Sequence, residues 1–452
     1  MKAINKKSQL QYIPHTKEDV SEMLKAIGCG SIDDLFVDIS SKYKPKSFNL
    51  PEGISEFDVM KYLRNLAQKN KGPLKCFLGG GFYDHYIPEA ANYLASRGEF
   101  LTAYTPYQPE CSQGTLQALY EFQSVICSLT GMEVANASLY EGGTALYEAV
   151  MMAIRITKRK KVVIDSGVNP IYRKILSSYT TNLEYHFEES EVVHGQSDRD
   201  KITKLLDKDT AVLVLQNPNF FGAIDDHSDL IEKAHELGVL VVESVYPISL
   251  GLLKSPGEID ADIVVGDGQS MGHPLQLGGP YLGFMATKGK FIRKMPGRVV
   301  GQTVDRSGKQ CFVNTIQARE QHIRREKATS NICTNSALCA IQSLIYLSLL
   351  GKQGLKELAQ VNLDKAEYAK VSLEKIPGIE VKRSSPTFNE FTIKLPVDTH
   401  KIIGEMIDRG FIAGFPLGRY YKDMSQYMII AVTEQRTKED IDEYVGNLKE
   451  IL

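Results

Sequence analysis

The 452-residue sequence lacks several features that would assign it to a class at once. It has no tryptophan, no run of about 18 apolar residues that could span a membrane, and no apolar N-terminal stretch typical of a signal peptide. Its 53 Lys and Arg residues nearly balance 55 Asp and Glu residues, whereas nucleic-acid binders usually show a basic excess. We therefore expect a globular protein of the cytoplasm with no nucleic-acid and no membrane partner.

Motifs for metals and phosphates are missing as well. The seven cysteines are scattered, with no CxxC pair, which favours reduced thiols, and no HExxH motif occurs, so we expect no metal site. The sequence has no GxxxxGK[ST] loop. Gly266-Asp267-Gly268 follows a predicted strand, but the third glycine comes one position too late for a dinucleotide fingerprint, and Asp267 would repel phosphates.

Hydrophobic patterning divides the chain into three predicted regions. Capping boxes at Thr16 and Ser55 predict short helices in an N-terminal helical arm over residues 1–73. Apolar runs separated by helical segments then predict a large parallel-sheet α/β domain over 74–330. A smaller C-terminal α/β domain is predicted over 331–452. The runs read as strands of the large sheet are 161–165, 211–215, 239–242, 262–265 and 281–286.

Three loops stand out as candidates for function. Residues 78–88 combine three glycines with an aromatic and polar cluster, and residues 102–114 hold two prolines that fix an extended loop. An elaborate structural loop or a subunit contact explains either one equally well. The third loop is at the start of a predicted buried helix, at Glu141-Gly142-Gly143-Thr144. Glycines and a threonine at a helix N-terminus can hold a phosphate, but an ordinary helix cap fits this sequence too. The negative charge of Glu141 also disfavours a dianionic phosphate nearby.

The large and small α/β domains suit a pyridoxal-phosphate enzyme, which makes two demands of the sequence. A carboxylate near the end of a late strand should bind the pyridinium nitrogen, and Glu243 is placed for it. A lysine after the next strand should form the Schiff base. That demand fails because residues 255–287 contain no Lys or Arg. Lys254 comes before the predicted strand at 262–265 and Lys288 comes after the one at 281–286, so neither lies where the Schiff-base lysine is expected.

Five long segments resemble one family, the glycine cleavage system P-protein, in the first subunit of its two-subunit prokaryotic form. They are LGGGFYDHYIP, TAYTPYQPECSQGTLQALYEFQ, TGMEVANASLYEGGTALYEA, DADIVVGDGQSMGHPLQLGGPYLGFMA and AVTEQRTKEDID. The resemblance extends over nearly the whole chain. It implies the aspartate-aminotransferase-like fold, fold type I of the pyridoxal-phosphate-dependent transferases, with a smaller C-terminal α/β domain.

The resemblance also implies glycine dehydrogenase (decarboxylating) activity shared with a homologous second subunit, as a heterodimer or an α2β2 heterotetramer. That subunit would hold pyridoxal 5'-phosphate on its lysine, which aligns near Gln269–Ser270 of this chain. Glycine would lose CO2, and its aminomethyl group would pass to the lipoyl group of the H-protein. The T and L proteins of the system are further expected partners.

From the fold and the resemblance we expect this chain to form one wall of the glycine and lipoyl channel, with no catalytic residue of its own. The candidate wall residues are Phe82, Tyr83, His85, Tyr104, Thr105, Tyr107, Gln108 and Glu110. Gly278 and Gly279, with bare backbone N–H groups, are candidates for contacting the partner's cofactor phosphate, although a simple turn fits them equally well. Residues 98–154 contain six Glu and no basic residue, and we assign them to the partner and active-site face.

Two other hypotheses remain open at this point. The chain could be a non-catalytic structural or regulatory subunit that keeps the fold only to stabilise its partner. It could also be an active pyridoxal enzyme that uses Lys254 or Lys288.

Overall fold

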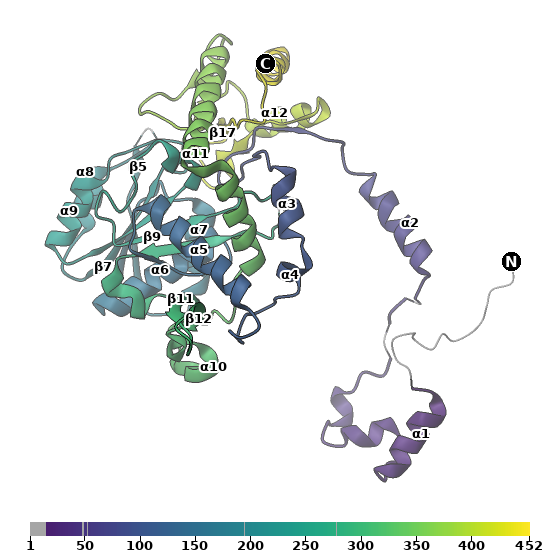
Figure 1. The fold of residues 1–452 in the computed structure, drawn as a ribbon. Coiled ribbons are helices and arrows are strands. Elements are labelled where there is room, and N and C mark those ends of the chain that lie inside the picture. Colours follow the sequence, from purple (N-terminus) through teal and green to yellow (C-terminus); the bar gives the residue numbers. More distant parts are fainter. Residues whose placement is uncertain (1–14, 48, 52, 194, 277) are drawn as a thin grey trace, which may run out of the picture. The chain divides into compact units, whose positions relative to one another are not determined.

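A computed structural model describes residues 15–452 except 48, 52, 194 and 277, and the side chains of 192 and 193 are left aside (Figure 1). The chain forms two compact units, Met1–Lys71 and Gly72–Leu452. The first unit contains α1 (Lys17–Ala26), η1 (Ile32–Phe36), η2 (Ser41–Tyr43) and α2 (Glu56–Ala67). Thr16 and Ser55 cap α1 and α2 as predicted, and none of these four elements buries a residue.

The second unit is built around a seven-stranded sheet with the order β2-β10-β9-β8-β7-β3-β4. Strands β4, β3, β7, β8 and β9 run parallel, as the apolar runs predicted. The expectation that residues 281–286 continue the parallel sheet is wrong, because β10 is antiparallel to both β9 and β2. The 15 residues that join β9 to β10 form no helix within the described part of the chain, and parallel neighbours are usually joined by a crossover helix. The strands are β2 (Val134–Ala135), β10 (Gly283–Thr287), β9 (Ile263–Asp267), β8 (Leu240–Val245), β7 (Thr210–Asn217), β3 (Lys161–Ile164) and β4 (His186–Glu189).

Helices cover both faces of this sheet because successive strand residues point to opposite sides. Val212 and Val214 of β7 pack in one core with α6 (Gly142–Thr157) and α7 (Pro170–Tyr179). Leu213 and Leu215 pack in the other core, against α5 (Gln113–Thr130), α8 (Arg199–Leu205), α9 (Ser228–Glu236) and the first half of α11 (Ala337–Leu373).

A second, antiparallel sheet has the order β13-β14-β17-β16 and packs against α12, α13 and the second half of α11. Residue Gly351, at φ 63°, kinks α11 between its two halves. The short strand β1 pairs in parallel with β15, and Phe77 joins the core of this C-terminal region. The bounds are β1 (Lys75–Cys76), β13 (Glu380–Val381), β14 (Glu390–Lys394), β15 (Phe411–Ile412), β16 (Phe415–Pro416), β17 (Tyr427–Ala431), α12 (Thr399–Asp408) and α13 (Lys438–Ile451).

Short elements connect these parts. The hairpin of β11 and β12 lies next to α10 in Figure 1. The remaining bounds are α3 (Glu89–Ala95), α4 (Gly98–Leu101), β5 (Val192–Val193), β6 (Gln196–Ser197), η3 (Pro247–Gly251), η4 (Gly289–Lys294), β11 (Val299–Val304), β12 (Gln310–Thr315), η5 (Gln317–Arg319), α10 (Gln321–Arg324), η6 (Arg325–Lys327) and η7 (Leu417–Arg419). No helix among the described residues has both the length and the apolar character to cross a membrane.

Candidate functional site: a filled cleft and an exposed aromatic loop

A small cavity lies where the parallel strands end at their carboxyl edge, the usual place for ligands in open α/β sheets. Gln216, Ser244 and Asp267 lie within the last two residues of β7, β8 and β9 and line it, and Asn389 and Glu390 line it from the start of β14 in the second sheet. Its volume is about 40 Å³, which is room for a few water molecules at most. Side chains of this chain therefore occupy most of the cleft.

Two carboxylates cap the N-terminus of α6, which begins at this cavity. Glu141 accepts hydrogen bonds from the backbone N–H groups of Gly143 (2.5 Å) and Thr144 (2.9 Å), and Asp267 accepts one from Gly142 (2.9 Å). Burial raises the pKa of Asp267 to about 7. A side-chain carbon added at Gly142 would lie 2.4 Å from the Tyr172 hydroxyl, so that ring covers the same helix end. The structure shows the ordinary helix cap, and the expectation that Glu141 disfavours a phosphate stays a prediction.

The glycine-rich loop at 79–86 packs into the cleft against a buried glutamate. Glu390 accepts a hydrogen bond from the Gly80 backbone N–H and one of 2.8 Å from the Tyr83 hydroxyl. A side-chain carbon at Gly79 would lie 2.2 Å from Glu390 Oε1, which explains why a residue without a side chain stands there. Burial raises the pKa of Glu390 to about 7.

Gln269 follows β9, near the place where the resemblance would align the partner's lysine. Its amide Nε2 donates to the carbonyls of Tyr83 and His273, each at 2.9 Å, and its Oε1 accepts from the Tyr83 N–H at 3.2 Å. Because Gln269 is only 1% exposed, its donors and acceptor are taken up by the chain itself. The residue fixes the glycine-rich loop to the end of β9.

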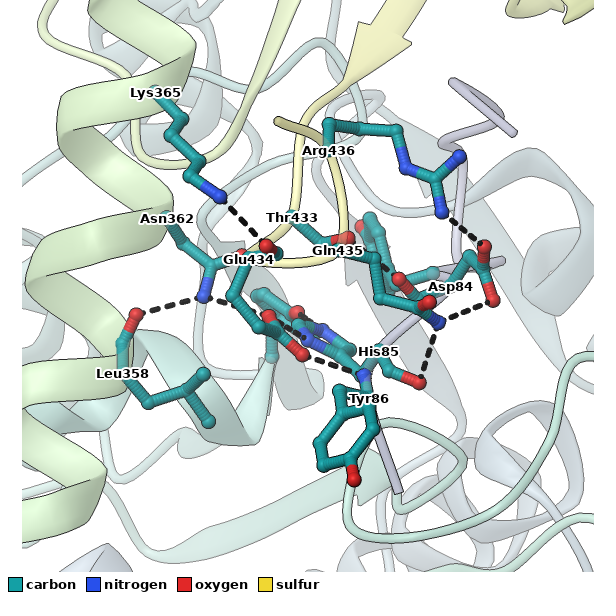
Figure 2. A network of polar contacts seen from close by, with 12 residues as sticks. Asp84, His85, Tyr86, Leu358, Asn362, Lys365, Thr433, Glu434, Gln435 and Arg436 are labelled. Atoms are coloured by element: carbon teal, nitrogen blue, oxygen red, sulfur yellow. Dashed lines mark hydrogen bonds and ion pairs between the residues drawn. The ribbon is translucent and has the colours of Figure 1, made fainter. Parts of the chain in front are cut away.

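His85 anchors the other end of this loop to the motif around Glu434 (Figure 2). Its Nδ1 lies 2.8 Å from Glu434 Oε2, and its Nε2 is hydrogen-bonded to the Tyr246 hydroxyl. Glu434 also accepts from the Tyr86 N–H (2.6 Å) and from Asn362 of α11 (3.1 Å). Burial opposes ionisation of Glu434, but His85 and the hydrogen bonds outweigh it and lower its pKa to about 2.

Asp84 completes the same network. Its carboxylate accepts from Gln435 and Arg436, each at 3.0 Å, and its carbonyl accepts from the Thr433 hydroxyl (Figure 2). The network therefore joins the glycine-rich loop, α11 and the segment after β17 into one rigid unit.

Glu243 does not face the cavity. It lies on β8 but points toward α9, where its Oε1 is 2.9 Å from His227 Nδ1 and both side chains are about 1% exposed. Burial alone would lower the pKa of His227, but the Glu243 carboxylate raises it overall. The expectation that Glu243 is placed for a pyridinium nitrogen is wrong for this chain.

The second candidate loop remains accessible. Tyr104 is 84% exposed and Tyr107 51%, and Gln108 and Glu110 are exposed as well, while Thr105 is half-buried. The buried Arg298 holds Tyr107 through a 2.8 Å hydrogen bond to its hydroxyl and lies 5.0 Å from its ring centroid. The exposed ring of Tyr107 is thus held in place by the buried Arg298.

The predicted site residues fall into two groups. Tyr83 and His85 are buried and satisfied inside the chain. Phe82 is half-buried, 6.5 Å from the ring of Tyr281, which follows the open turn at Gly278 and Gly279. The channel and phosphate roles given to these residues stay predictions. The sequence reasoning missed Glu390, Glu434 and Arg298 and named Gln269 only as an aligned position, and a signal existed for Glu434, which lies in a quoted motif.

Comparisons with known proteins fit this architecture. A solved glycine decarboxylase (P-protein) of the glycine cleavage system, in inhibitor-bound form, is 42% identical and covers 97% of this chain and 99% of its own, with a TM-score of 0.89. A C-DES variant with glycine covalently linked to its PLP cofactor shares the fold at 14% identity and a TM-score of 0.62, over 83% and 96% of the two chains. The fold is therefore fold type I of the pyridoxal-phosphate-dependent enzymes.

The model of the glycine cleavage system P-protein family matches residues 10–448. A relative from Geotalea uraniireducens (strain Rf4), described as probable glycine dehydrogenase (decarboxylating) subunit 1, is 53% identical over 440 residues, 97% of this chain and 99% of its own. The chain belongs to the glycine cleavage system P-protein family.

Pyridoxal phosphate does not fit the cleft of this chain. The helix end that would hold its phosphate already carries Glu141 and Asp267, the cavity at the strand ends has a volume of about 40 Å³, and residues 255–287 offer no lysine. Phosphate and carboxylate would repel each other at one helix end.

Proposed function

We propose that the chain is subunit 1 of glycine dehydrogenase (decarboxylating) in the glycine cleavage system. With subunit 2 it decarboxylates glycine, releases CO2 and passes the aminomethyl group to the lipoyl arm of the H-protein. Subunit 2 holds pyridoxal phosphate on its own lysine, and the pair works in the cytoplasm as a heterodimer or α2β2 heterotetramer alongside the T and L proteins. The filled cleft carries this proposal, because a P-protein that cannot hold the cofactor needs a subunit that does.

In this proposal the chain contributes a surface and no chemistry of its own. Tyr104, Tyr107, Gln108 and Glu110 are exposed and supply the channel wall, with Phe82 and Thr105 at its base. Tyr83 and His85 hold the loop that carries Phe82, through Glu390 and Glu434. Gly278 is exposed, and a side-chain carbon there would lie 3.8 Å from the Gln276 carbonyl oxygen, so we expect its backbone N–H to be able to approach the partner's phosphate. The names of the relatives do not favour a purely structural subunit.

Reconstitution tests this proposal. We expect glycine-dependent CO2 release only when this chain, subunit 2, pyridoxal phosphate and lipoylated H-protein are mixed. Borohydride treatment with pyridoxal phosphate should label no lysine of this chain alone, and covalent labelling of Lys254 or Lys288 would contradict the proposal. Tyr107→Phe should lower the rate of the assembled complex severalfold, whereas full activity of assembled Tyr107→Phe and Tyr104→Phe variants would favour a scaffold role.

A further inference from the structure

The described part of the first unit, residues 15–71, exposes more apolar surface than its length would suggest. We call this segment the arm. None of its described residues is buried. It holds sixteen of the 33 large apolar side chains that are exposed among the described residues of the whole chain. Apolar surface gathered in this way marks an interaction site, whereas single exposed apolar residues do not.

The exposed apolar side chains of α2 form a stripe along one side of the helix. They follow the three- and four-residue spacing of a helix face and are between 37% and 59% exposed. The stripe consists of Val59, Met60, Tyr62, Leu63 and Leu66. A helix with such a stripe normally packs it against another surface.

The helices of the arm have little stability of their own. Helix α1 has 10 residues and α2 has 12, and isolated helices of this length are marginal in water. Thr16 and Ser55 cap them, but neither helix buries a residue. Since packing of the apolar face supplies most of the stability of a protein helix, we expect a further surface to hold the arm in order.

The charge and size of the arm indicate what kind of surface this is. Residues 15–71 contain nine Lys and Arg and nine Asp and Glu. Nucleic acids and anionic membranes attract basic segments, so the balance favours neither. The sixteen exposed apolar side chains approach the roughly 20–30 residues that one partner contributes to a stable protein interface, and permanent interfaces are the most apolar ones.

We propose that the arm wraps an apolar surface of subunit 2 and forms a permanent part of the subunit interface. This inference rests on the proposed function, in which the filled cleft makes this chain depend on subunit 2 for the cofactor. A second copy of this chain would cover the arm without supplying a cofactor. The exposed apolar residues extend from Met23 to Leu66, and a segment that becomes ordered on binding can cover such an extended surface.

Two glutamates placed on the stripe test the inference in the full-length chain. In Leu63→Glu/Leu66→Glu we expect the dissociation constant for subunit 2, measured by titration calorimetry, to rise about tenfold or more. Asn65→Glu/Gln68→Glu adds the same two negative charges on the opposite side of α2 and should leave the constant unchanged. Both variants should keep the wild-type melting temperature, because α2 contributes no residue to a core.

Trypsin gives a second readout that does not depend on substitutions. The arm should be cut in the isolated chain and resist cleavage in the complex with subunit 2. An arm that already resists trypsin in the isolated chain would show that it needs no partner, and would overturn the inference.

Other outcomes would overturn it as well. An unchanged dissociation constant for Leu63→Glu/Leu66→Glu would show that the stripe does not bind subunit 2. Light scattering that finds a dimer of the isolated wild-type chain, and a monomer of this variant, would assign the arm to a second copy. Failure of the wild-type chain to bind subunit 2 at all would instead refute the proposed function, since the pairing itself would be missing.

Discussion

Glu390 and Glu434 hold the two ends of the glycine-rich loop under opposite electrostatic conditions. The donors to Glu390 among the described residues are neutral, the Gly80 N–H and the Tyr83 hydroxyl, so burial dominates and raises its pKa to about 7. Glu434 has the His85 imidazole at 2.8 Å, and its pKa falls to about 2. A pKa that differs between the folded and unfolded protein makes the free energy of unfolding depend on pH. Because the two pKa values shift in opposite directions, Glu390 and Glu434 should affect stability at opposite ends of the pH range.

The wild-type protein should lose stability as pH rises and Glu390 ionises, and Glu390→Gln should not show this loss. A folded pKa above the ordinary 4.5 means that the contribution of Glu390 is complete below pH 4.5 and is lost as pH rises through about 7. We expect the melting temperature of the variant relative to the wild type to be higher at pH 8 than at pH 5. Glu380→Gln, on the neighbouring strand, is the control. An equal difference at both pH values would contradict the assignment.

Glu434→Gln should show the reverse. With a folded pKa of about 2, Glu434 stabilises the protein above pH 4.5 and loses this contribution as pH falls toward 2. The variant should melt well below the wild type at pH 6, and the gap should narrow at pH 3.5, as followed by circular dichroism. Glu439→Gln, an exposed glutamate of α13, should show no such trend. A gap that widens on acidification would be evidence against the His85 contact.

At the scale of elements, the N-terminus of α6 shows how capping residues can occupy a helix end that would otherwise bind an anion. Its N-terminus points at the cleft, yet Glu141 and Asp267 satisfy the N–H groups that would otherwise bind an anion. The sequence left a phosphate site and an ordinary cap open as alternatives here, and the cap could be considered at all because an N-cap acts within a few residues. It could not predict that Glu390 receives the glycine-rich loop, since the two are more than 300 residues apart and meet only in the folded chain.

Glu141→Ala should cost about 1 kcal/mol of unfolding free energy, because two backbone N–H groups lose their acceptor. It should still not make the isolated chain bind pyridoxal phosphate, since Asp267 and Tyr172 remain on the helix end. Denaturant titration and equilibrium dialysis measure the two effects, with Thr437→Ala at the exposed cap of α13 as the matched control. Tight cofactor binding by the variant would show that Glu141 alone closes the site.

At the scale of the whole molecule, the total number of charged residues hides how those charges are distributed along the chain. The near balance of charges excluded a basic binder, yet residues 288–327 are strongly basic, and a count along the chain would have found them. Strand and helix order were predictable because burial on both faces and capping are local signals. The antiparallel β10 was not, because its apolar run reads the same in either direction.

Limited proteolysis should separate the two units. Trypsin should cut first after Lys69 or Lys71, where the chain between α2 and β1 has little regular structure. The fragment from Gly72 onward should keep its circular dichroism, whereas the released arm, whose helices bury no residue, should be degraded. Mass spectrometry of the first products checks this, and initial cleavage inside α11 would contradict it.

The pairing of β1 with β15 also bears on how the protein is made. Lys75 and Cys76 leave the ribosome early, but their strand partners, Phe411 and Ile412, emerge more than 300 residues later, and Tyr444 then stacks on Phe77 at 4.2 Å between centroids. At about 5–20 residues per second the first strand waits roughly half a minute without its sheet. The C-terminal region therefore completes its core only after synthesis is nearly finished, and a ribosome that stalls before residue 411 holds a chain in which β1 is unpaired and the apolar ring of Phe77 next to it is uncovered, a natural substrate for chaperones.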